Sequence, residues 1–463
     1  MSPKVVVIGL DGLVPEIVFG PQGQQLGCLR RLMSSGRWGP LTSTHPPISV
    51  PAWVSAFTGL DPGELGIYGF RNLRPGSYRM ELATGHQLRH KWVWEIAADE
   101  GLSSVVMGVP LTYPPRPTRG VVVSGIPVPP HAGPITRPQA LWPRIKRAGY
   151  IVDMEGFRHM SPPEVLARAA EMASTRFQIW TGLISEWKPA LAVVVEMAPD
   201  RVHHCLWAHH DPLHSLHDPS SPWREAVIEH YKLLDRLVEQ VVEKLEPGTW
   251  VVVMSDHGAQ RLTGALAINE WLASKGLLAL RSRPSEPQPL SPQIVDWSHT
   301  KVWAEGGYYA RIFLNATERQ PMGTLEPHEA HQLMQTLARE LEAMRGLDGK
   351  LLGNQVLMPQ QLYRQLRGQP PELMLYPAGL KMRALSTIWP EPPRDFILPP
   401  GTSGLDQANH SLQGVLIVTR KNQPLPQAGQ QLPPCHIQAL APTLLKMLEL
   451  RPPEWMPSPW MCL

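Results

Sequence analysis

Three aspartates lie at or shortly behind the ends of apolar runs, and two of them have histidine close by. Asp11 follows Val-Val-Val-Ile-Gly-Leu, and the pair Asp256 and His257 follows Trp-Val-Val-Val-Met-Ser. Asp200 lies a few residues beyond Leu-Ala-Val-Val-Val-Glu-Met. One such aspartate usually caps the next helix. Three in one chain, with histidine, instead indicate a set of carboxylates and imidazoles that suits zinc or another borderline divalent metal.

The segment Asp200-Arg-Val-His-His204 contains two candidate ligands of its own. An aspartate and a histidine four residues apart lie on one face of a helix and can point at one ion. His203 is three residues from Asp200 and shares that face, so spacing leaves the choice between His203 and His204 open. Further histidines follow at positions 209, 210, 214 and 217, and a histidine-rich surface is therefore the alternative interpretation.

Ser49 lies between prolines in Pro46-Pro-Ile-Ser-Val-Pro-Ala-Trp53, just before a helix start expected at Pro51. The simplest interpretation is a helix N-cap. The alternative is a nucleophile, because the N-terminus of a helix favours an anionic phosphate. A serine hydroxyl is weak at neutral pH, and direct coordination to a divalent cation would lower its pKa and activate it.

These residues need a scaffold that brings the ends of several strands together. Short runs rich in Val, Ile and Leu, without strict alternation, predict buried parallel strands at residues 5–10, 104–108, 191–196, 250–254 and 414–418. Helical patterns occur between them, at residues 161–186, 221–245, 327–347 and 438–448. This order predicts an α/β fold with a mainly parallel sheet. Ligands of such sheets bind beyond the carboxyl ends of the strands, where Asp11 and Asp256 lie.

The length and the pattern together predict one large domain, 1–463, that carries an insertion. Between about 282 and 385 the simple alternation of strands and helices breaks down. We therefore expect an insertion or lid region there, within the same domain.

Composition narrows the possible partners and location. A formal net charge of +3 over 463 residues, with no basic stripe carrying interleaved aromatics, argues against a nucleic-acid partner. No secretion signal and no run of about 18 apolar residues are visible. The four cysteines have neither metal-ligand nor redox-motif spacing. A cytoplasmic protein without a transmembrane segment is therefore expected, and its oligomeric state is left open.

The order of these motifs resembles the type I phosphodiesterase/nucleotide pyrophosphatase family of the alkaline phosphatase superfamily. The matching segments, in chain order, are Ile8-Gly-Leu-Asp-Gly12, Pro47-Ile-Ser-Val-Pro-Ala-Trp53, Thr58-Gly-Leu-Asp-Pro-Gly63, Asp200-Arg-Val-His-His-Cys-Leu-Trp207, Ser255-Asp-His-Gly258, Asn409-His-Ser-Leu-Gln-Gly414 and Ile437-Gln-Ala-Leu-Ala-Pro-Thr-Leu-Leu445. The resemblance implies an alkaline-phosphatase-like three-layer α/β/α sandwich with a mainly parallel central sheet.

The resemblance also implies a metal-dependent phosphoester hydrolase, a phosphodiesterase or nucleotide pyrophosphatase, that acts on a small-molecule phosphoester with two divalent metal ions, expected to be Zn²⁺. Ser49 would touch one ion and attack phosphorus in line. The implied ligands form two groups: Asp200, His204 and His410 for one ion, and Asp11, Asp256 and His257 for the other.

Some positions depart from the pattern of the family. Many relatives have threonine at the position of Ser49, and Leu65 replaces a histidine that often follows the Thr-Gly motif. Nucleotide pyrophosphatases carry an asparagine, thought to bind a phosphate oxygen, at the position of Phe70. Asn72 is the predicted substitute for it as a substrate-binding residue. The substitution at Phe70 leaves nucleotide specificity open.

Other functions of the same fold are alternatives to a phosphodiesterase. The sequence does not separate it from a phosphomonoesterase or phosphomutase of the superfamily, or from a non-catalytic metal-binding descendant. A sulfatase is disfavoured, because sulfatases have an arginine four residues beyond the nucleophile and this chain has Trp53 there.

Overall fold

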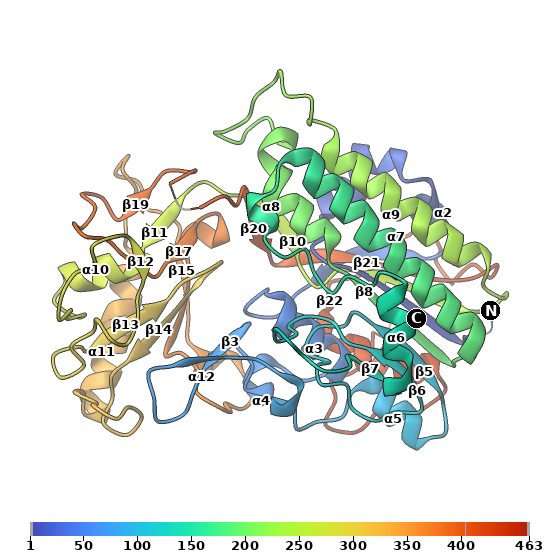
Figure 1. Cartoon of the computed structure of the whole chain (residues 1–463), viewed down its shortest axis with the longest axis horizontal. Helices are drawn as coiled ribbons and strands as arrows, with labels where there is room; N and C mark the ends of the chain where they lie inside the picture. Colours follow the sequence, from blue (N-terminus) through green and yellow to red (C-terminus); the bar gives the residue numbers. More distant parts are fainter. Residues whose placement is uncertain (1–2, 403, 461–463) are drawn as a thin grey trace.

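A nine-stranded sheet runs through the larger part of the computed structural model, which describes residues 3–402 and 404–460 (Figure 1). Its strands follow the order β22-β2-β21-β9-β1-β8-β5-β6-β7. Their bounds in chain order are β1 Val5–Leu10, β2 Arg37–Thr42, β5 Ser104–Met107, β6 Gly120–Val123, β7 Thr136–Arg137, β8 Leu191–Glu196, β9 Trp250–Met254, β21 Gln413–Arg420 and β22 Cys435–His436.

The middle of this sheet is parallel, and its edges are mixed. Strands β9, β1, β8, β5 and β6 are parallel neighbours. Strand β21 is antiparallel to both β9 and β2, and β7 is antiparallel to β6. The prediction of a parallel strand at residues 414–418 is therefore wrong in direction. Residues 414–419 are buried, and burial on both faces gives an unbroken apolar run whatever the direction of the strand.

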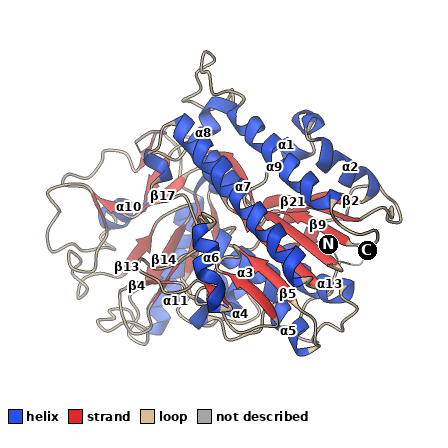
Figure 2. Ribbon diagram, turned by 45° about the vertical axis from the view of Figure 1, so that its right-hand side comes forward, coloured by secondary structure: helices blue, strands red, loops and turns tan. Residues whose placement is uncertain are grey.

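Two layers of helices cover the sheet (Figures 1 and 2). One layer contains α2 (Gly27–Ser35), α7 (Pro162–Trp187), α8 (Ala198–His210) and α9 (Ala226–Glu243), which pack against one another. The other contains α3 (Ser49–Thr58), α5 (Val93–Asp99) and α13 (Leu440–Met447). The α/β fold with a large, mostly parallel central sheet is thus confirmed.

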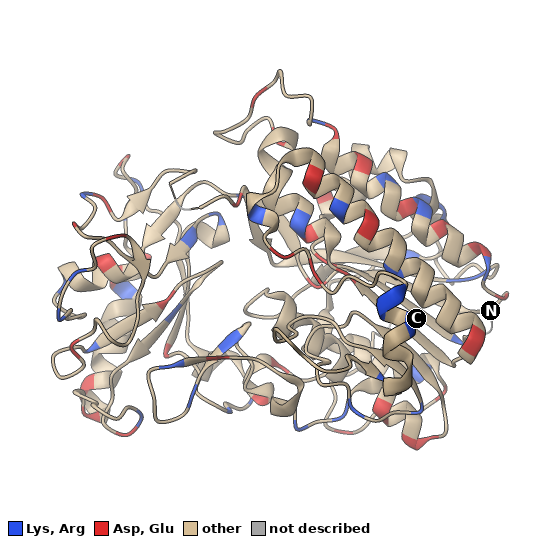
Figure 3. Cartoon of the chain, in the orientation of Figure 1, with Lys and Arg blue, Asp and Glu red and all other residues tan. Residues whose placement is uncertain are grey.

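Charged residues of both signs are mixed along α7 and α9 (Figure 3).

A second region, from β11 (Ala265–Ala267) to β19 (Ile397–Leu398), has its own hydrophobic core and is called here the second lobe. Its main sheet is antiparallel in the order β13-β14-β16-β15. These strands are β13 Val302–Glu305, β14 Ala310–Leu314, β15 Gln355–Leu357 and β16 Leu373–Tyr376, and helices α10 (Ile268–Ser274) and α11 (Pro327–Glu342) pack on them. The bounds 282–385 and the role of a lid stay predictions.

A short hairpin from the first part of the chain packs on the second lobe. Its strands are β3 (Arg71–Leu73) and β4 (Met80–Leu82). Leu73 is buried in the core of the second lobe, and the ring of Tyr78 stacks on Trp297 with centroids 3.5 Å apart. The hairpin therefore packs against the core of the second lobe. In the described part of the chain, every helix is too short or too polar to cross a membrane.

Candidate metal centre

Asp11 leaves the sheet at the carboxyl end of β1. Its backbone N–H still donates to the carbonyl oxygen of Glu196 on β8, at 2.9 Å. Gly12 then turns the chain with φ +73, and its N–H donates to Oδ1 of Asp256 at 3.3 Å. A side chain at Gly12 would meet Asp200 at 3.4 Å. Glycine is suited to this position because it adopts positive φ without strain and lets the carboxylates approach.

His257 follows Asp256 directly behind the end of β9. Its Nδ1 lies 2.9 Å from the carbonyl oxygen of Gly258. A carbonyl oxygen only accepts hydrogen bonds, so Nδ1 carries a hydrogen and Nε2 is the ring atom left to bind a metal. That Nε2 faces two carboxylates, 3.2 Å from Oδ2 of Asp256 and 3.6 Å from Oδ1 of Asp11.

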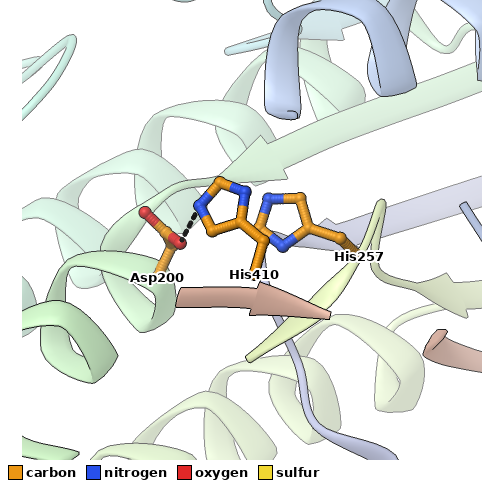
Figure 4. Close-up of side chains that lie close together, drawn as sticks. All are labelled: Asp200, His257 and His410. Atoms are coloured by element: carbon orange, nitrogen blue, oxygen red, sulfur yellow. Dashed lines mark ion pairs between the residues drawn. The ribbon is translucent and has the colours of Figure 1, made fainter. Parts of the chain in front are cut away.

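His204 on α8 and His410 on β20 (Ala408–Ser411) flank Asp200, which lies in the first turn of α8. Nδ1 of His204 donates to the carbonyl oxygen of Ala408 at 3.0 Å, and Nδ1 of His410 donates to that of Pro47 at 2.7 Å. The two Nε2 atoms lie 3.3 and 3.5 Å from Oδ1 of Asp200. Figure 4 shows the ring of His410 between Asp200 and His257.

All three histidines thus share one arrangement, with Nδ1 bound to a backbone carbonyl and Nε2 turned toward carboxylates. Metal-ligating histidines are oriented in this way, because the outer hydrogen bond fixes the tautomer. Among the described residues, Nε2 of His204, Nε2 of His410 and Oδ2 of Asp256 are buried without a hydrogen-bond partner. A buried polar atom without a partner is costly, and a bound cation would supply the partner. The residues present therefore fit a metal.

Two groups of possible ligands have their donor atoms within 4.8 Å of one another: Asp11, Asp256 and His257 in one, and Asp200, His257 and His410 in the other. The first group is the one that the family resemblance implies. The second group contains His257 at the place where the resemblance implies His204. Nε2 of His204 also lies close to Asp200, 3.3 Å from its Oδ1. The rings of His257 and His410 stack with centroids 3.8 Å apart (Figure 4). How the ligands divide between two ions stays a prediction.

The electrostatics of the site favour a cation. Burial, and next the repulsion from Asp256, raise the pKa of Asp11 well above its ordinary value. Burial and the charge of Asp200 do the same for the pKa of Asp256. Burial and the neighbouring His257 lower the pKa of His410 to about 3, so its imidazole is neutral. A neutral imidazole beside crowded carboxylates suits a divalent cation, because metal ligands must be deprotonated.

Ser49 is the first residue of α3, and Ile48 occupies the cap position without a side-chain cap bond. The N-cap interpretation of Ser49 is therefore wrong, since the helix begins two residues before Pro51. The Ser49 hydroxyl lies 3.4 Å from Oδ1 of Asp11 and 3.3 Å from Nε2 of His257. Four residues further along α3, Nε1 of Trp53 donates to Oδ2 of Asp11 at 2.7 Å and ties the helix to this site.

His203 has a hydrogen-bond partner in Tyr231. The Tyr231 hydroxyl accepts a hydrogen bond from the N–H of Val14 at 3.1 Å. Its own hydrogen is then available for Nε2 of His203, which lies 3.0 Å away. Nε2 of His204 instead lies 3.3 Å from Oδ1 of Asp200, so the geometry favours His204 of the two histidines.

Sequence reasoning missed the wall of the cavity beside the ligands. This cavity, of about 810 Å³, is lined by Ser49 and His410 together with four arginines: Arg71, Arg158, Arg201 and Arg383. Tyr308, on the loop between β13 and β14, stacks on His410 with centroids 4.1 Å apart and on His204 at 5.0 Å. Arg201 lies inside the Asp-Arg-Val-His-His motif, but no local sequence pattern marks the other positions.

Arg201 holds Asp200 in place. Its Nε and Nη2 donate to the two carboxylate oxygens of Asp153, each at 2.9 Å, and its Nη1 pairs with Oδ2 of Asp200. Burial alone would raise the pKa of Asp200, but His204, His410 and Arg201 hold that pKa well below its ordinary value. Asp200 is therefore an anion, as a metal ligand must be.

Asn72 has its side chain engaged in the local turn. Its Oδ1 accepts from the N–H of Tyr68 at 2.7 Å, and its Nδ2 donates to the carbonyl oxygen of Gly69 at 3.5 Å. The neighbours Phe70 and Arg71 line the cavity, whereas Asn72 is not one of its lining residues. The substrate contact predicted for Asn72 stays a prediction that these contacts do not support.

The fold and the ligand set define a class of proteins, the metal-dependent α/β hydrolases of phosphoesters. The family model for type I phosphodiesterase/nucleotide pyrophosphatase matches residues 5–393. The chain belongs to this family and is a hydrolase, as its motifs indicated. A search of curated proteins found no match. His410 lies beyond the matched residues, so its assignment rests on its position beside Asp200.

Proposed function

We propose that the protein hydrolyses a phosphodiester, with Ser49 as the nucleophile and two divalent cations, expected to be zinc, as cofactors. The position of the Ser49 hydroxyl carries the proposal. It is 1% exposed, at the N-terminus of a helix, and within 3.4 Å of both Asp11 and His257. Backbone N–H groups at such a terminus attract an anionic phosphate.

The reaction would proceed in two steps through a covalent intermediate on Ser49. The Ser49 oxygen forms a bond to phosphorus as the bond from phosphorus to the leaving oxygen breaks, and the leaving group takes up a proton. Water then attacks phosphorus in the resulting seryl phosphodiester, which releases the phosphomonoester that carries the second substituent and restores the serine hydroxyl. Cations held by the two ligand groups would lower the pKa of the Ser49 hydroxyl and neutralise charge on the phosphate oxygens.

The size of the cavity supports a diester rather than a monoester substrate. A diester keeps a second substituent on phosphorus throughout the attack, and this substituent needs space beside the nucleophile. The cavity of about 810 Å³ next to Ser49 offers that space, with Phe70, Phe157 and Tyr308 as apolar surfaces. Cavities of this size accept ligands much larger than a phosphate ion.

The test compares a chromogenic phosphodiester with its matching monoester, in the presence of zinc and after chelation. Faster cleavage of the diester, lost on chelation, is the expected result. Preference for the monoester would overturn the phosphodiesterase proposal in favour of a phosphomonoesterase or phosphomutase. Absence of turnover on both, with no bound metal, would point to a non-catalytic descendant.

We also infer a cytoplasmic location, which the state of two cysteines supports. Cys28 and Cys205 carry free thiols, and burial raises the pKa of each to about 12. Free thiols persist in a reducing compartment. Fractionation of cells that express the full chain tests this inference, and recovery outside the cytoplasm would contradict it.

A further inference from the structure

The cavity beside Ser49 has a strongly basic wall. Four arginines line it, against one aspartate, Asp153. Asp153 is committed to Arg201 through two hydrogen bonds of 2.9 Å, and this pair leaves little charge for a ligand. The other basic side chains of the wall therefore decide what the cavity attracts.

Arg158 keeps part of its positive charge. Its Nε donates to Oδ1 of Asp406 at 2.5 Å, and its Nη2 donates to the hydroxyl of Tyr308 at 2.8 Å. Asp406 forms ion pairs with two arginines, because its other oxygen lies 2.7 Å from Nη1 of Arg383. The field of Arg158 at the cavity is thus only partly cancelled.

Arg71 is the most available of the four. Within the described residues its guanidinium has no hydrogen bond and no carboxylate oxygen within 4.0 Å, and the residue is exposed. The carboxyl of Glu305 interacts with its charge, but this carboxyl interacts more strongly with Arg311. Arg71 therefore presents a largely unneutralised cation to the cavity.

The backbone of Arg71 is held by the second lobe. Its carbonyl oxygen accepts a hydrogen bond from Nη1 of Arg311, and β3 pairs with β4. Stacking of Tyr78 on Trp297 fixes the other end of the hairpin. The backbone of Arg71 is thus fixed, and its side chain lines the same cavity as Ser49.

We propose that Arg71 binds a second anionic group in the part of the substrate that Ser49 does not attack. The natural substrate is then a phosphoester that carries a further phosphate or carboxylate. The position of the attacked phosphate, though not the charge of Arg71, rests on the proposed function. An arginine suits this role, because its planar guanidinium binds carboxylate or phosphate through two parallel hydrogen bonds.

The test measures binding rather than turnover, by calorimetry on the zinc-loaded full chain. Three probes are compared: methylphosphonate with one anionic group, phosphonoacetate with an added carboxylate, and methylenediphosphonate with an added phosphonate. We expect at least one two-group probe to bind about tenfold more tightly than methylphosphonate, as a charge-assisted bond predicts. The probe with the larger advantage identifies the chemistry of the second group.

Arg71→Gln should reduce this advantage to about twofold or less, since glutamine keeps length and polarity but lacks the charge. Arg71→Lys should retain part of it. Arg74→Gln is the matched control, because Arg74 follows the same strand, pairs with Glu81 at 3.4 Å and does not line the cavity. It should bind all three probes as the wild type does.

Two results would overturn the inference. The first is equal binding of all three probes by the wild type. The second is an advantage that persists in Arg71→Gln, which would mean that the two-group probes bind more tightly only because they chelate the metal. Binding that depends on Arg71 in a protein without phosphodiesterase turnover would leave this inference standing and would reject the proposed function alone.

Discussion

The edge of the central sheet and the two hairpins that carry Arg71 and Tyr308 meet at one cavity, yet they are built in different ways. Asp11 and Asp256 lie directly behind β1 and β9, which are parallel neighbours. Short connections from the most buried strands fix these ligands. Tyr308 and Arg71 instead lie on antiparallel hairpins, β13–β14 and β3–β4, that belong to a separate hydrophobic core.

This difference suggests that the two regions have different roles, one in the chemistry and one in substrate binding. The sheet edge holds the groups that any phosphoester hydrolysis by this chain would need. The two hairpins hold groups that would contact the rest of the substrate, and their side chains can be changed without removing a ligand. Substitutions at the edge should therefore alter metal content and chemistry, whereas substitutions in the wall should alter which substrate is bound and how well.

The largest effect is expected at Ser49. Ser49→Ala removes the attacking oxygen, and kcat on a chromogenic phosphodiester should fall at least about a thousandfold. Ser55→Ala is the matched control, because Ser55 is a buried serine on the same helix whose hydroxyl has no partner among the described residues. Wild-type turnover by Ser49→Ala would break the assignment of the edge as the catalytic region.

The next effect is expected in metal content. His410→Ala removes one neutral imidazole from the buried site, so bound zinc, measured by elemental analysis, should fall by about one equivalent. His203→Ala, one residue from His204 but bonded to Tyr231, should keep its zinc. Equal metal content in wild type and His410→Ala would show that another residue completes the site.

A wall substitution should act more weakly and differently. Tyr308→Leu removes the ring that stacks on His204 and His410, and kcat/KM should fall about tenfold with metal content unchanged. Tyr308→Phe keeps the ring but loses the hydroxyl that accepts a hydrogen bond from Arg158. Its kcat/KM should lie between the values of the wild type and of Tyr308→Leu. Loss of metal from Tyr308→Leu would erase the distinction between edge and wall.

The smallest effect is on local stability. Chelation should lower the free energy of local opening at the sheet edge by about 1–3 kcal/mol, because metal binds only the folded site. Hydrogen exchange should quicken in peptides from α8 and β10 (Gly258–Arg261), and stay the same in α11 of the second lobe. Equal acceleration in both regions would mean that the two cores open together.

The sequence was most informative where burial is greatest. The predicted bounds of β1, β8 and β9 coincide with those in the structure, since a strand covered on both faces leaves an unbroken apolar run. The helix predicted at 221–245 begins later, at Ala226, because turns occupy the residues just before it. The direction of β21 depends on its pairing with β9, which no local pattern contains.

The same reasoning explains what could be predicted of the site. Asp11, Asp256 and His257 were recognisable because each follows a strand that the sequence shows. Tyr308 and Arg71 reach the cavity only through the packing of hairpins far apart in the chain. Nothing in their local sequence reports that approach.

The carboxylates and histidines at the sheet edge are proposed to bind two divalent cations. Elemental analysis of the full chain, purified with zinc supplied and dialysed, tests this binding most directly. We predict about two equivalents per chain in the wild type and about one in Asp256→Asn, which loses a charged ligand. A wild-type protein that retains no divalent metal would contradict the account.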